Sequence, residues 1–186
     1  MPKAYQKMPF NVDIMPLLKS LKTNAYLFGQ IPFRGLDESP HREMTDIWIR
    51  YKDIIPNLNS GDFSNFTDEH ESIWYPASRE VPEVKKVIFD VMHGVYGERL
   101  GGVLITKLPP GGKIYPHKDA GWHAEFYEKY FIPIQNAPGA IFGFDEGIIE
   151  PTPGEVWRFD NSYNHWVKND SDQDRVSMII CIKRSN

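Results

Sequence analysis

A chain of 186 residues is long enough for one hydrophobic core, and we expect a single domain over residues 1–186 rather than two. The formal net charge of -4 and the lack of any long Lys/Arg run argue against a nucleic-acid partner. No window is apolar enough for a membrane span or a signal peptide, and one cysteine, Cys181, excludes an intrachain disulfide, so we expect a cytoplasmic protein with no membrane partner.

The N-terminal part, residues 1–98, predicts a few helices that brace a sheet. Apolar residues recur three or four positions apart over residues 10–21, which is the spacing of one helix face. The same spacing follows Pro82, which suits the first position of a helix, and it ends at Gly94 and Gly97. Each helix would therefore have one apolar face to bury.

The segments around these helices give weaker signals. Residues 23–44 contain several Gly and Pro breakers, so we expect this stretch to wrap the surface. Apolar and polar residues alternate over residues 46–54, which predicts a half-exposed strand. Polar residues dominate 56–66 and predict a mobile loop. These N-terminal strands and loops are expected on the substrate side of the protein.

Residues 99–184 consist of short β runs separated by Gly- and Pro-containing turns, such as 109–112 and 151–154. Eight such runs predict a mainly β fold, a double-stranded β-helix (a jelly roll, cupin-like) that forms the catalytic core. The predicted runs are residues 100–108, 113–117, 125–134, 140–144, 147–150, 155–159, 163–167 and 175–183.

Three potential metal ligands fall at one mouth of this predicted barrel. His117 ends the second run, Asp119 follows in the next loop, and His165 lies on the seventh run. A His-x-Asp pair with a distant second His is the facial triad of non-haem Fe(II) oxygenases, which leaves positions open for a co-substrate and O₂. His123 closely follows Asp119 and is a rival ligand on the sequence alone.

The last run predicts a carboxylate-binding site. Arg175 and Ser177 are two residues apart, so their side chains point to the same face of a strand. A guanidinium binds a carboxylate bidentately, which predicts an anionic ligand near the metal. The alternative is an ion pair between Arg175 and Asp172 or Asp174 at the start of the strand.

The ordered motifs from residue 100 to 183 resemble the aspartyl/asparaginyl β-hydroxylase family of Fe(II)- and 2-oxoglutarate-dependent dioxygenases. That family carries a Gly-Glu-x-Trp-x-Phe stretch, a distal His, an Asn-containing turn and an Arg on the final strand. Here the corresponding residues are 154–162 (Gly-Glu-Val-Trp-Arg-Phe-Asp-Asn-Ser), His165, Asn169 and Arg175. Residues 74–77 (Trp-Tyr-Pro-Ala) and 121–127 (Gly-Trp-His-Ala-Glu-Phe-Tyr) resemble bacterial members.

The resemblance implies a hydroxylase that acts on an unactivated C–H bond. His117, Asp119 and His165 would hold Fe(II), and 2-oxoglutarate and O₂ would be the co-substrates. Mammalian-type members of the family have Gly where this chain has Asp119, so their metal is held by two histidines only. Asp119 would restore the full triad.

The resemblance also assigns the co-substrate contacts. The far carboxylate of 2-oxoglutarate would meet Arg175 and Ser177. Many relatives place an Arg-x-His pair on the third strand, where this chain has Lys129 and Phe131. Lys129 keeps the cation that would touch the inner carboxylate, whereas Phe131 cannot donate a hydrogen bond.

The substrate is open on the sequence among a small molecule such as a free amino acid, a peptide and a protein side chain, and the oligomeric state is also open. Candidate residues for the substrate wall are Trp48, Arg50, Trp74, Tyr75, Trp122 and His123. Core packing is the alternative for most of these aromatic side chains.

Two other functions remain open at this point. The first is a cupin-like enzyme that holds Zn or Mn with the same ligands and does not use 2-oxoglutarate; Arg175 and Ser177 argue against it. The second is a barrel without catalysis that binds a carboxylate or a peptide, and the complete triad argues against that function.

Overall fold

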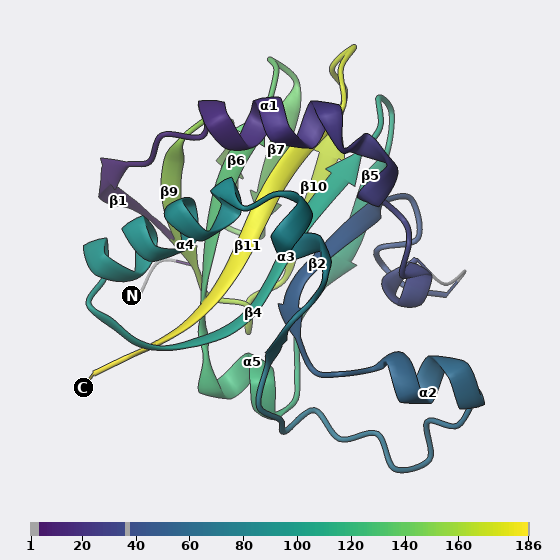
Figure 1. The fold of residues 1–186 in the computed structure, drawn as a ribbon. Helices are drawn as coiled ribbons and strands as arrows, with labels where there is room; N and C mark the ends of the chain where they lie inside the picture. The colour runs from purple at the N-terminus through teal and green to yellow at the C-terminus, as the bar shows by residue number, and fades with distance from the viewer. Residues whose placement is uncertain (1–3, 36–37, 186) are drawn as a thin grey trace.

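In the computed structural model, which describes residues 4–35 and 38–185, the described chain forms two antiparallel β-sheets packed face to face (Figure 1). The larger sheet has the strand order β1-β9-β6-β11-β4-β2-β3, and the smaller has the order β5-β10-β7-β8. Hydrophobic side chains from both sheets pack between them. This architecture is a jelly roll, and it confirms the mainly β fold predicted from the turns and short runs.

The bounds of the elements are as follows. The larger sheet contains β1 (Tyr5–Asn11), β2 (Thr45–Tyr51), β3 (Ile73–Trp74), β4 (Gly97–Leu108), β6 (Glu128–Gln135), β9 (Glu155–Phe159) and β11 (Arg175–Arg184). The smaller sheet contains β5 (Lys113–His117), β7 (Ala140–Phe144), β8 (Gly147–Ile149) and β10 (His165–Asn169). The helices are α1 (Met15–Thr23), α2 (Ile55–Ser60), α3 (Ala77–Glu80), α4 (Glu83–Gly94) and α5 (Trp122–Phe126), with 3-10 turns η1 (Ala25–Leu27) and η2 (Pro32–Arg34).

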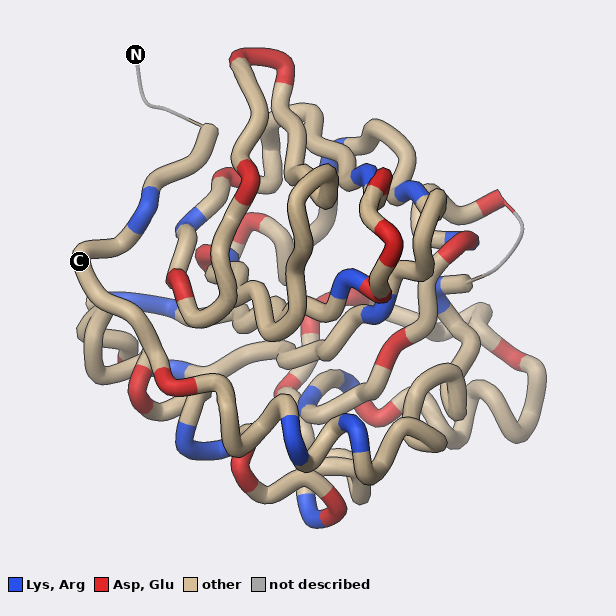
Figure 2. Tube along the Cα trace, turned by 90° about the horizontal axis from the view of Figure 1, so that it is seen from above, with Lys and Arg blue, Asp and Glu red and all other residues tan. Residues whose placement is uncertain are grey.

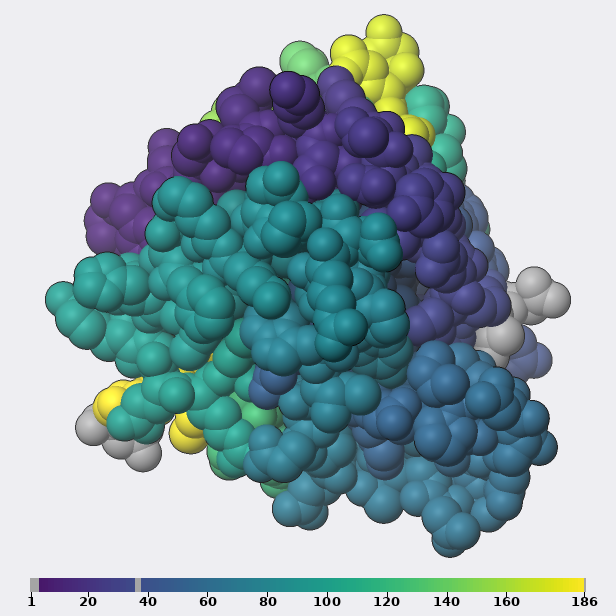
Figure 3. Space-filling view, viewed as in Figure 1, coloured from purple at the N-terminus to yellow at the C-terminus, as the bar shows by residue number. Residues whose placement is uncertain are grey.

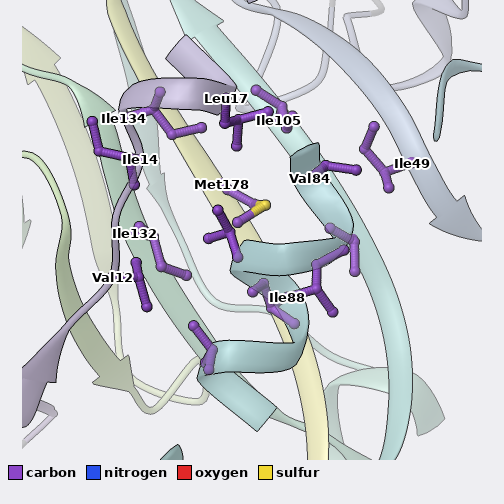
Figure 4. Packing of buried hydrophobic residues seen from close by; sticks show 14 of the residues in the cluster. Val12, Ile14, Leu17, Ile49, Val84, Ile88, Ile105, Ile132, Ile134 and Met178 are labelled. Atoms are coloured by element: carbon purple, nitrogen blue, oxygen red, sulfur yellow. The ribbon is translucent and has the colours of Figure 1, made fainter. Parts of the chain in front are cut away.

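The outer face of the larger sheet is covered by α1 and α4 (Figure 1). Leu17 of α1 and Val84 and Ile88 of α4 point at side chains of the sheet such as Ile105 and Met178 (Figure 4). All five are less than 2% exposed, and full burial of such a side chain stabilises the fold by about 1.5–3 kcal/mol. The two helices therefore brace the sheet, as their apolar spacing predicted.

All eight predicted β runs are strands, β4 to β11, with some ends shifted. The third run was predicted to begin at residue 125, but residues 122–126 form the short helix α5 and β6 begins at Glu128. The backbone N–H of His123, in the first turn of α5, donates to the carboxylate of Asp68 (2.8 Å). That acceptor is 55 residues away in the sequence, so the local pattern did not indicate the turn.

Two N-terminal predictions were wrong in part. The helix predicted over residues 10–21 begins only at Met15, because the chain up to Asn11 forms β1 at the edge of the larger sheet and pairs with β9. Residues 56–66, predicted as a loop, contain most of α2, which has no buried residue and ends at Gly61 in the left-handed conformation (φ 68°). Figure 3 shows this segment in blue, in a lobe at the lower right.

The strand predicted as half-exposed is buried on both faces. Ile47 and Ile49 of β2 join the core under the helices, whereas Asp46 and Trp48 face the interior between the sheets and are only 4% and 3% exposed. β2 pairs with β4 on one edge and with β3 on the other, while the core under the helices covers one of its faces and the interior between the sheets lies on the other.

Charged residues of both signs are interspersed along the trace (Figure 2). Among residues 4–35 and 38–185, no helix is both long and apolar enough to cross a membrane.

Candidate active site

The three predicted metal ligands meet where β5 and β10 lie side by side. His117, the last residue of β5, pairs in register with His165, the first residue of β10. Asp119 follows in a loop that is fixed by its backbone N–H, which donates to the carbonyl oxygen of Asn161 (2.9 Å). One ligand atom from each of the three side chains lies within 4.8 Å of the other two.

Backbone carbonyls set the tautomers of both imidazoles. Nδ1 of His117 lies 2.7 Å from the carbonyl oxygen of Tyr115, and Nδ1 of His165 lies 2.9 Å from that of Tyr163. A carbonyl oxygen only accepts, so Nδ1 carries the proton and the lone pair of Nε2 is free for a metal. Burial lowers the pKa of His165 and favours its neutral, ligating form.

The triad has the donor set that a metal requires. Nε2 of His117 is buried with no hydrogen-bond partner among the described residues, which is explained if a metal ion binds it. Burial opposes the charge on Asp119, but the ion pair with the Lys129 ammonium outweighs burial, and the pKa of Asp119 is lowered to about 2. Two neutral imidazoles and one carboxylate fit an Fe(II) facial triad.

Arg175 is a buried cation with no counterion among residues 4–35 and 38–185. Its side chain is 2% exposed, and Nη1 donates to Oγ of Ser177 (3.0 Å) while the guanidinium lies 5.1 Å from the ring centroid of Phe131. Nε has no partner among the described residues, and neither Asp172 nor Asp174 forms an ion pair with it. The alternative of an ion pair at the start of the strand is therefore not what the structure shows.

Burial lowers the pKa of Arg175 to about 10, so the guanidinium stays charged near neutral pH. An uncompensated buried charge costs several kcal/mol, so a fold that keeps one is expected to obtain its counterion from a bound ligand. The geometry is therefore that of an anion site.

The triad and Arg175 line one cavity with a volume of about 270 Å³ between the two sheets. β11 contributes alternate residues to its wall: Arg175, Ser177, Ile179 and Cys181. Phe131, Phe142 and Phe159 add apolar surface, and Lys129 lines the cavity beside Asp119. A metal site and an anion site thus share one largely apolar chamber.

The sequence model of the aspartyl/asparaginyl beta-hydroxylase family matches residues 64–185. The chain belongs to this family. The match confirms the resemblance stated on the motifs, and it includes both the region from residue 100 to 183 and the motif at residues 74–77. A comparison with curated proteins finds no match.

Several solved structures of 2-oxoglutarate oxygenases have the same fold as this chain. A prolyl hydroxylase from Trichoplax adhaerens, solved with a hypoxia inducible factor peptide fragment, is 9% identical with a TM-score of 0.61, over 97% of this chain and 83% of that one. A 2OG-Fe(II) oxygenase family oxidoreductase from Burkholderia pseudomallei is 18% identical with a TM-score of 0.58, over 98% and 85%. The collagen prolyl hydroxylase vCPH of Paramecium bursaria Chlorella virus-1, solved with 2OG, is 12% identical with a TM-score of 0.54, over 99% and 97%.

The residues predicted for the substrate wall of this family member divide into two groups. Trp48 and His123 line the cavity. His123, the rival ligand, is not one of the side chains whose ligand atoms meet within 4.8 Å; its ring stacks instead on His70 at 5.3 Å.

The other four do not line the cavity. Arg50 donates to the carbonyl oxygen of Leu100 (3.4 Å) and lies 5.3 Å from the Trp74 ring centroid. Trp122 stacks on Phe126 at 4.6 Å. Tyr75 packs against Trp48 (5.8 Å between ring centroids) and donates its hydroxyl to the Lys52 carbonyl oxygen (2.6 Å). Tyr75 is buried, whereas Trp74 is 37% exposed, and a substrate contact of the side chains outside the cavity stays a prediction.

Sequence reasoning missed a polar group on the cavity wall. Arg34 forms an ion pair with Asp46 (3.2 Å), which also accepts from the Thr106 hydroxyl (2.9 Å). Arg34 also contacts His41, whose ring lies 4.7 Å from that of His117. Burial and the Arg34 charge lower the pKa of His41 to about 2, so it is neutral. Arg34 and His41 come from the stretch expected to wrap the surface, which instead reaches the barrel mouth.

Proposed function

We propose that this protein is an Fe(II)- and 2-oxoglutarate-dependent dioxygenase that hydroxylates an unactivated C–H bond of an amino-acid, peptide or protein side-chain substrate. Membership of the β-hydroxylase family and the fold shared with 2OG-Fe(II) oxygenases support a hydroxylase. The observation that carries the proposal is the buried, uncompensated guanidinium of Arg175 in the cavity that also holds the His117, Asp119 and His165 ligand atoms.

The chain's own residues would bind and orient the co-substrate. The guanidinium of Arg175 and the hydroxyl of Ser177 donate to the far carboxylate of 2-oxoglutarate, which replaces the missing counterion. Lys129 lies beside Asp119, where its ammonium can reach the carboxylate next to the keto group. Phe131 contributes an apolar face that packs on the methylene chain and excludes water.

The metal would be held by Nε2 of His117 and His165 and by the carboxylate of Asp119. When bound there, Fe(II) supplies the redox chemistry that couples oxidative decarboxylation of 2-oxoglutarate to hydroxylation. The overall reaction converts 2-oxoglutarate, O₂ and the C–H substrate into succinate, CO₂ and the hydroxylated product. The protein supplies position and a chamber that is largely shielded from water.

Two observations support an amino-acid, peptide or protein side chain as the substrate. The family name specifies aspartyl and asparaginyl side chains, and the Trichoplax prolyl hydroxylase with the same fold is solved with a peptide fragment. The proposal therefore includes peptide and protein side chains as well as free amino acids.

Succinate formation tests the proposal. The purified chain should convert 2-oxoglutarate to succinate slowly without substrate, and only when Fe(II) and O₂ are both present. Arg175→Ala should lose this activity at low 2-oxoglutarate, whereas Arg184→Ala, which removes a guanidinium from the other end of β11, should retain it. Succinate formation that is independent of Fe(II), or no succinate at all from iron-loaded protein, would contradict the proposal.

A further inference from the structure

We infer that the end of the cavity away from Arg175 binds a cationic group of the primary substrate, an ammonium or a guanidinium, with Asp68 as its counterion. The inference rests on the proposed function for the assignment of Arg175 to the co-substrate. It goes beyond that function because it names the charge of the substrate.

The two ends of the cavity are separated along β4, which contributes Gly102, Leu104 and Thr106 to the wall. Thr106 pairs in register with Ser177, which accepts from Arg175, so the anion site lies at this level. A side chain at Gly102 would lie within 3.4 Å of both Tyr51 and His123, so these two rings lie beside Gly102, at the end of the cavity away from Arg175. Gly102 and Thr106 are four residues apart on β4, so the two ends of the cavity are about 13 Å apart along the strand.

The charges that line the cavity leave one carboxylate without a cation. Arg34 is paired with Asp46, and Lys129 is paired with Asp119. Among the lining side chains that the structure describes, only Arg175 and Asp68 carry a charge with no ionic partner within 4.0 Å. The proposed co-substrate neutralises Arg175, which leaves the partly exposed carboxylate of Asp68 available to pair with a cationic group of the substrate.

Asp68 is held in place by two neutral donors. Its Oδ2 accepts the backbone N–H of His123 (2.8 Å), and its Oδ1 lies 3.4 Å from the hydroxyl of Tyr51. The approach is close enough that Gly121 is required: a Cβ there would lie 2.7 Å from Oδ2, and its φ of +98° also disfavours a side chain. A carboxylate can accept about four hydrogen bonds, so a fixed Asp68 has acceptor capacity left for a ligand.

The walls around Asp68 favour a cation. Trp48 and Tyr51 meet edge to face at 5.3 Å, Phe33 lies 6.2 Å from Trp48, and all three line the cavity. Aromatic faces attract ammonium and guanidinium groups. Burial and the neighbouring His70 lower the pKa of His123 to about 4, so no positive imidazole competes there near neutral pH.

A second observation indicates that this end binds a ligand. His123 is 5% exposed and lines the cavity, yet its Nε2 is buried with no hydrogen-bond partner among the described residues. A buried imidazole nitrogen without a partner is costly unless a ligand supplies one. An anionic substrate group would instead face the Asp68 carboxylate, and the nearby Arg34 is already committed to Asp46.

Matched probes test the sign of the charge directly. The N-acetyl N-methylamides of lysine, arginine, norleucine and glutamate share one neutral frame and differ in the side chain. Norleucine methylamide with a free α-amine tests whether the cation can be the α-ammonium. Each is titrated calorimetrically into the full chain, alone and with Fe(II) plus 2-oxoglutarate under anaerobic conditions.

The lysine or arginine probe should bind at least about tenfold more tightly than the acetylated norleucine probe, because a hydrogen bond to a charged partner is worth about 1.5–3 kcal/mol. Asp68→Asn should abolish this preference. Glu69→Gln, which removes the same charge from an exposed neighbour, should leave it unchanged. Circular dichroism shows whether Asp68→Asn is folded, and if it is not, the probe series on the unmodified chain decides.

The inference would be overturned if neither the lysine and arginine probes nor the free-amine norleucine probe bound more tightly than the acetylated norleucine probe, or if the glutamate probe bound most tightly. A folded Asp68→Asn variant that keeps the preference would also overturn it. A cation preference in a chain that forms no succinate would support Asp68 and remove only the proposed oxygenase function. Succinate formation without any cation preference would support the proposed oxygenase function and remove the role of Asp68.

Discussion

The two faces of β11 have opposite compositions although they alternate along one strand. The face under α1 and α4 is apolar and buried: Val176, Met178, Ile180 and Ile182. The face toward the cavity carries Arg175, Ser177, Ile179 and Cys181. The first face holds the helices on the sheet, and the second places a charge where water is excluded. One strand therefore serves stability on one side and ligand binding on the other, because successive side chains point to opposite faces.

This difference predicts opposite effects of substitutions on neighbouring positions. A truncation on the helix face removes packing and lowers the free energy of unfolding. Removal of the charge on the cavity face removes a desolvation cost and lowers ligand affinity instead.

Arg175→Met should weaken 2-oxoglutarate binding by at least about tenfold, since truncation of one partner of a desolvated charge pair costs roughly 2–5 kcal/mol. The same change should leave the thermal midpoint equal or higher, because an uncompensated buried charge is replaced by an apolar side chain of similar length. Calorimetric titration with 2-oxoglutarate and thermal denaturation measure the two effects. A lower midpoint with unchanged affinity would make Arg175 a structural residue.

Ile180→Ala should lower the free energy of unfolding by about 2–5 kcal/mol, since Ile180 is fully buried under the helices. Below its thermal transition the variant should bind 2-oxoglutarate as the unmodified chain does. Urea denaturation measures the first effect and titration the second. Loss of co-substrate affinity in the folded variant would show that the two faces are not independent.

Asp119→Ala should weaken Fe(II) binding by at least about tenfold and leave the fold intact, because metal affinity depends on the deprotonated ligands present. Asp119→Gly copies the two-histidine relatives and is the matched comparison. Metal competition with a chromogenic chelator measures affinity, and circular dichroism checks the fold. If both variants hold iron as tightly as the unmodified chain, Asp119 is not a ligand.

Ser177→Ala should weaken 2-oxoglutarate binding roughly 2- to 10-fold, the value of one hydrogen bond of about 0.5–1.5 kcal/mol. Its hydroxyl contacts the Arg175 guanidinium, so the loss should be much smaller in an Arg175→Met background. The double-mutant cycle measures this coupling. Additive losses would show that the two side chains act separately.

The sequence predicted the site residues that lie on or next to strands with clear apolar patterns. His117 and His165 sit at paired ends of β5 and β10, and Asp119 follows in the next loop, so their meeting at one mouth followed from the barrel itself. Arg175 begins β11 further inside the cavity, and the alternation of that strand placed it on the same face as Ser177. β1 was missed because its pairing with β9, rather than its own weak pattern, stabilises it at the sheet edge.

Long-range contacts decide the remainder of the site. Arg34 and His41 reach the cavity from a Gly- and Pro-rich stretch with no periodicity. Contacts with distant strands fix their place, among them the ion pair of Arg34 with Asp46 and the hydrogen bond from the backbone N–H of Tyr115 to the carbonyl oxygen of Pro40 (2.9 Å). Trp74 and Trp122 do not line the cavity and contact Arg50 and Phe126 instead, so their substrate role stays a prediction that the sequence could not separate from packing.

Anaerobic titration shows whether one cavity binds Fe(II) and 2-oxoglutarate together. Addition of 2-oxoglutarate to the Fe(II)-loaded chain should produce the weak visible charge-transfer absorption of the chelate, which saturates at one equivalent. Arg175→Met should require at least about tenfold more 2-oxoglutarate to reach the same absorption. If the iron-loaded, folded protein shows no such absorption at saturating 2-oxoglutarate, Fe(II) and 2-oxoglutarate do not bind together in this cavity.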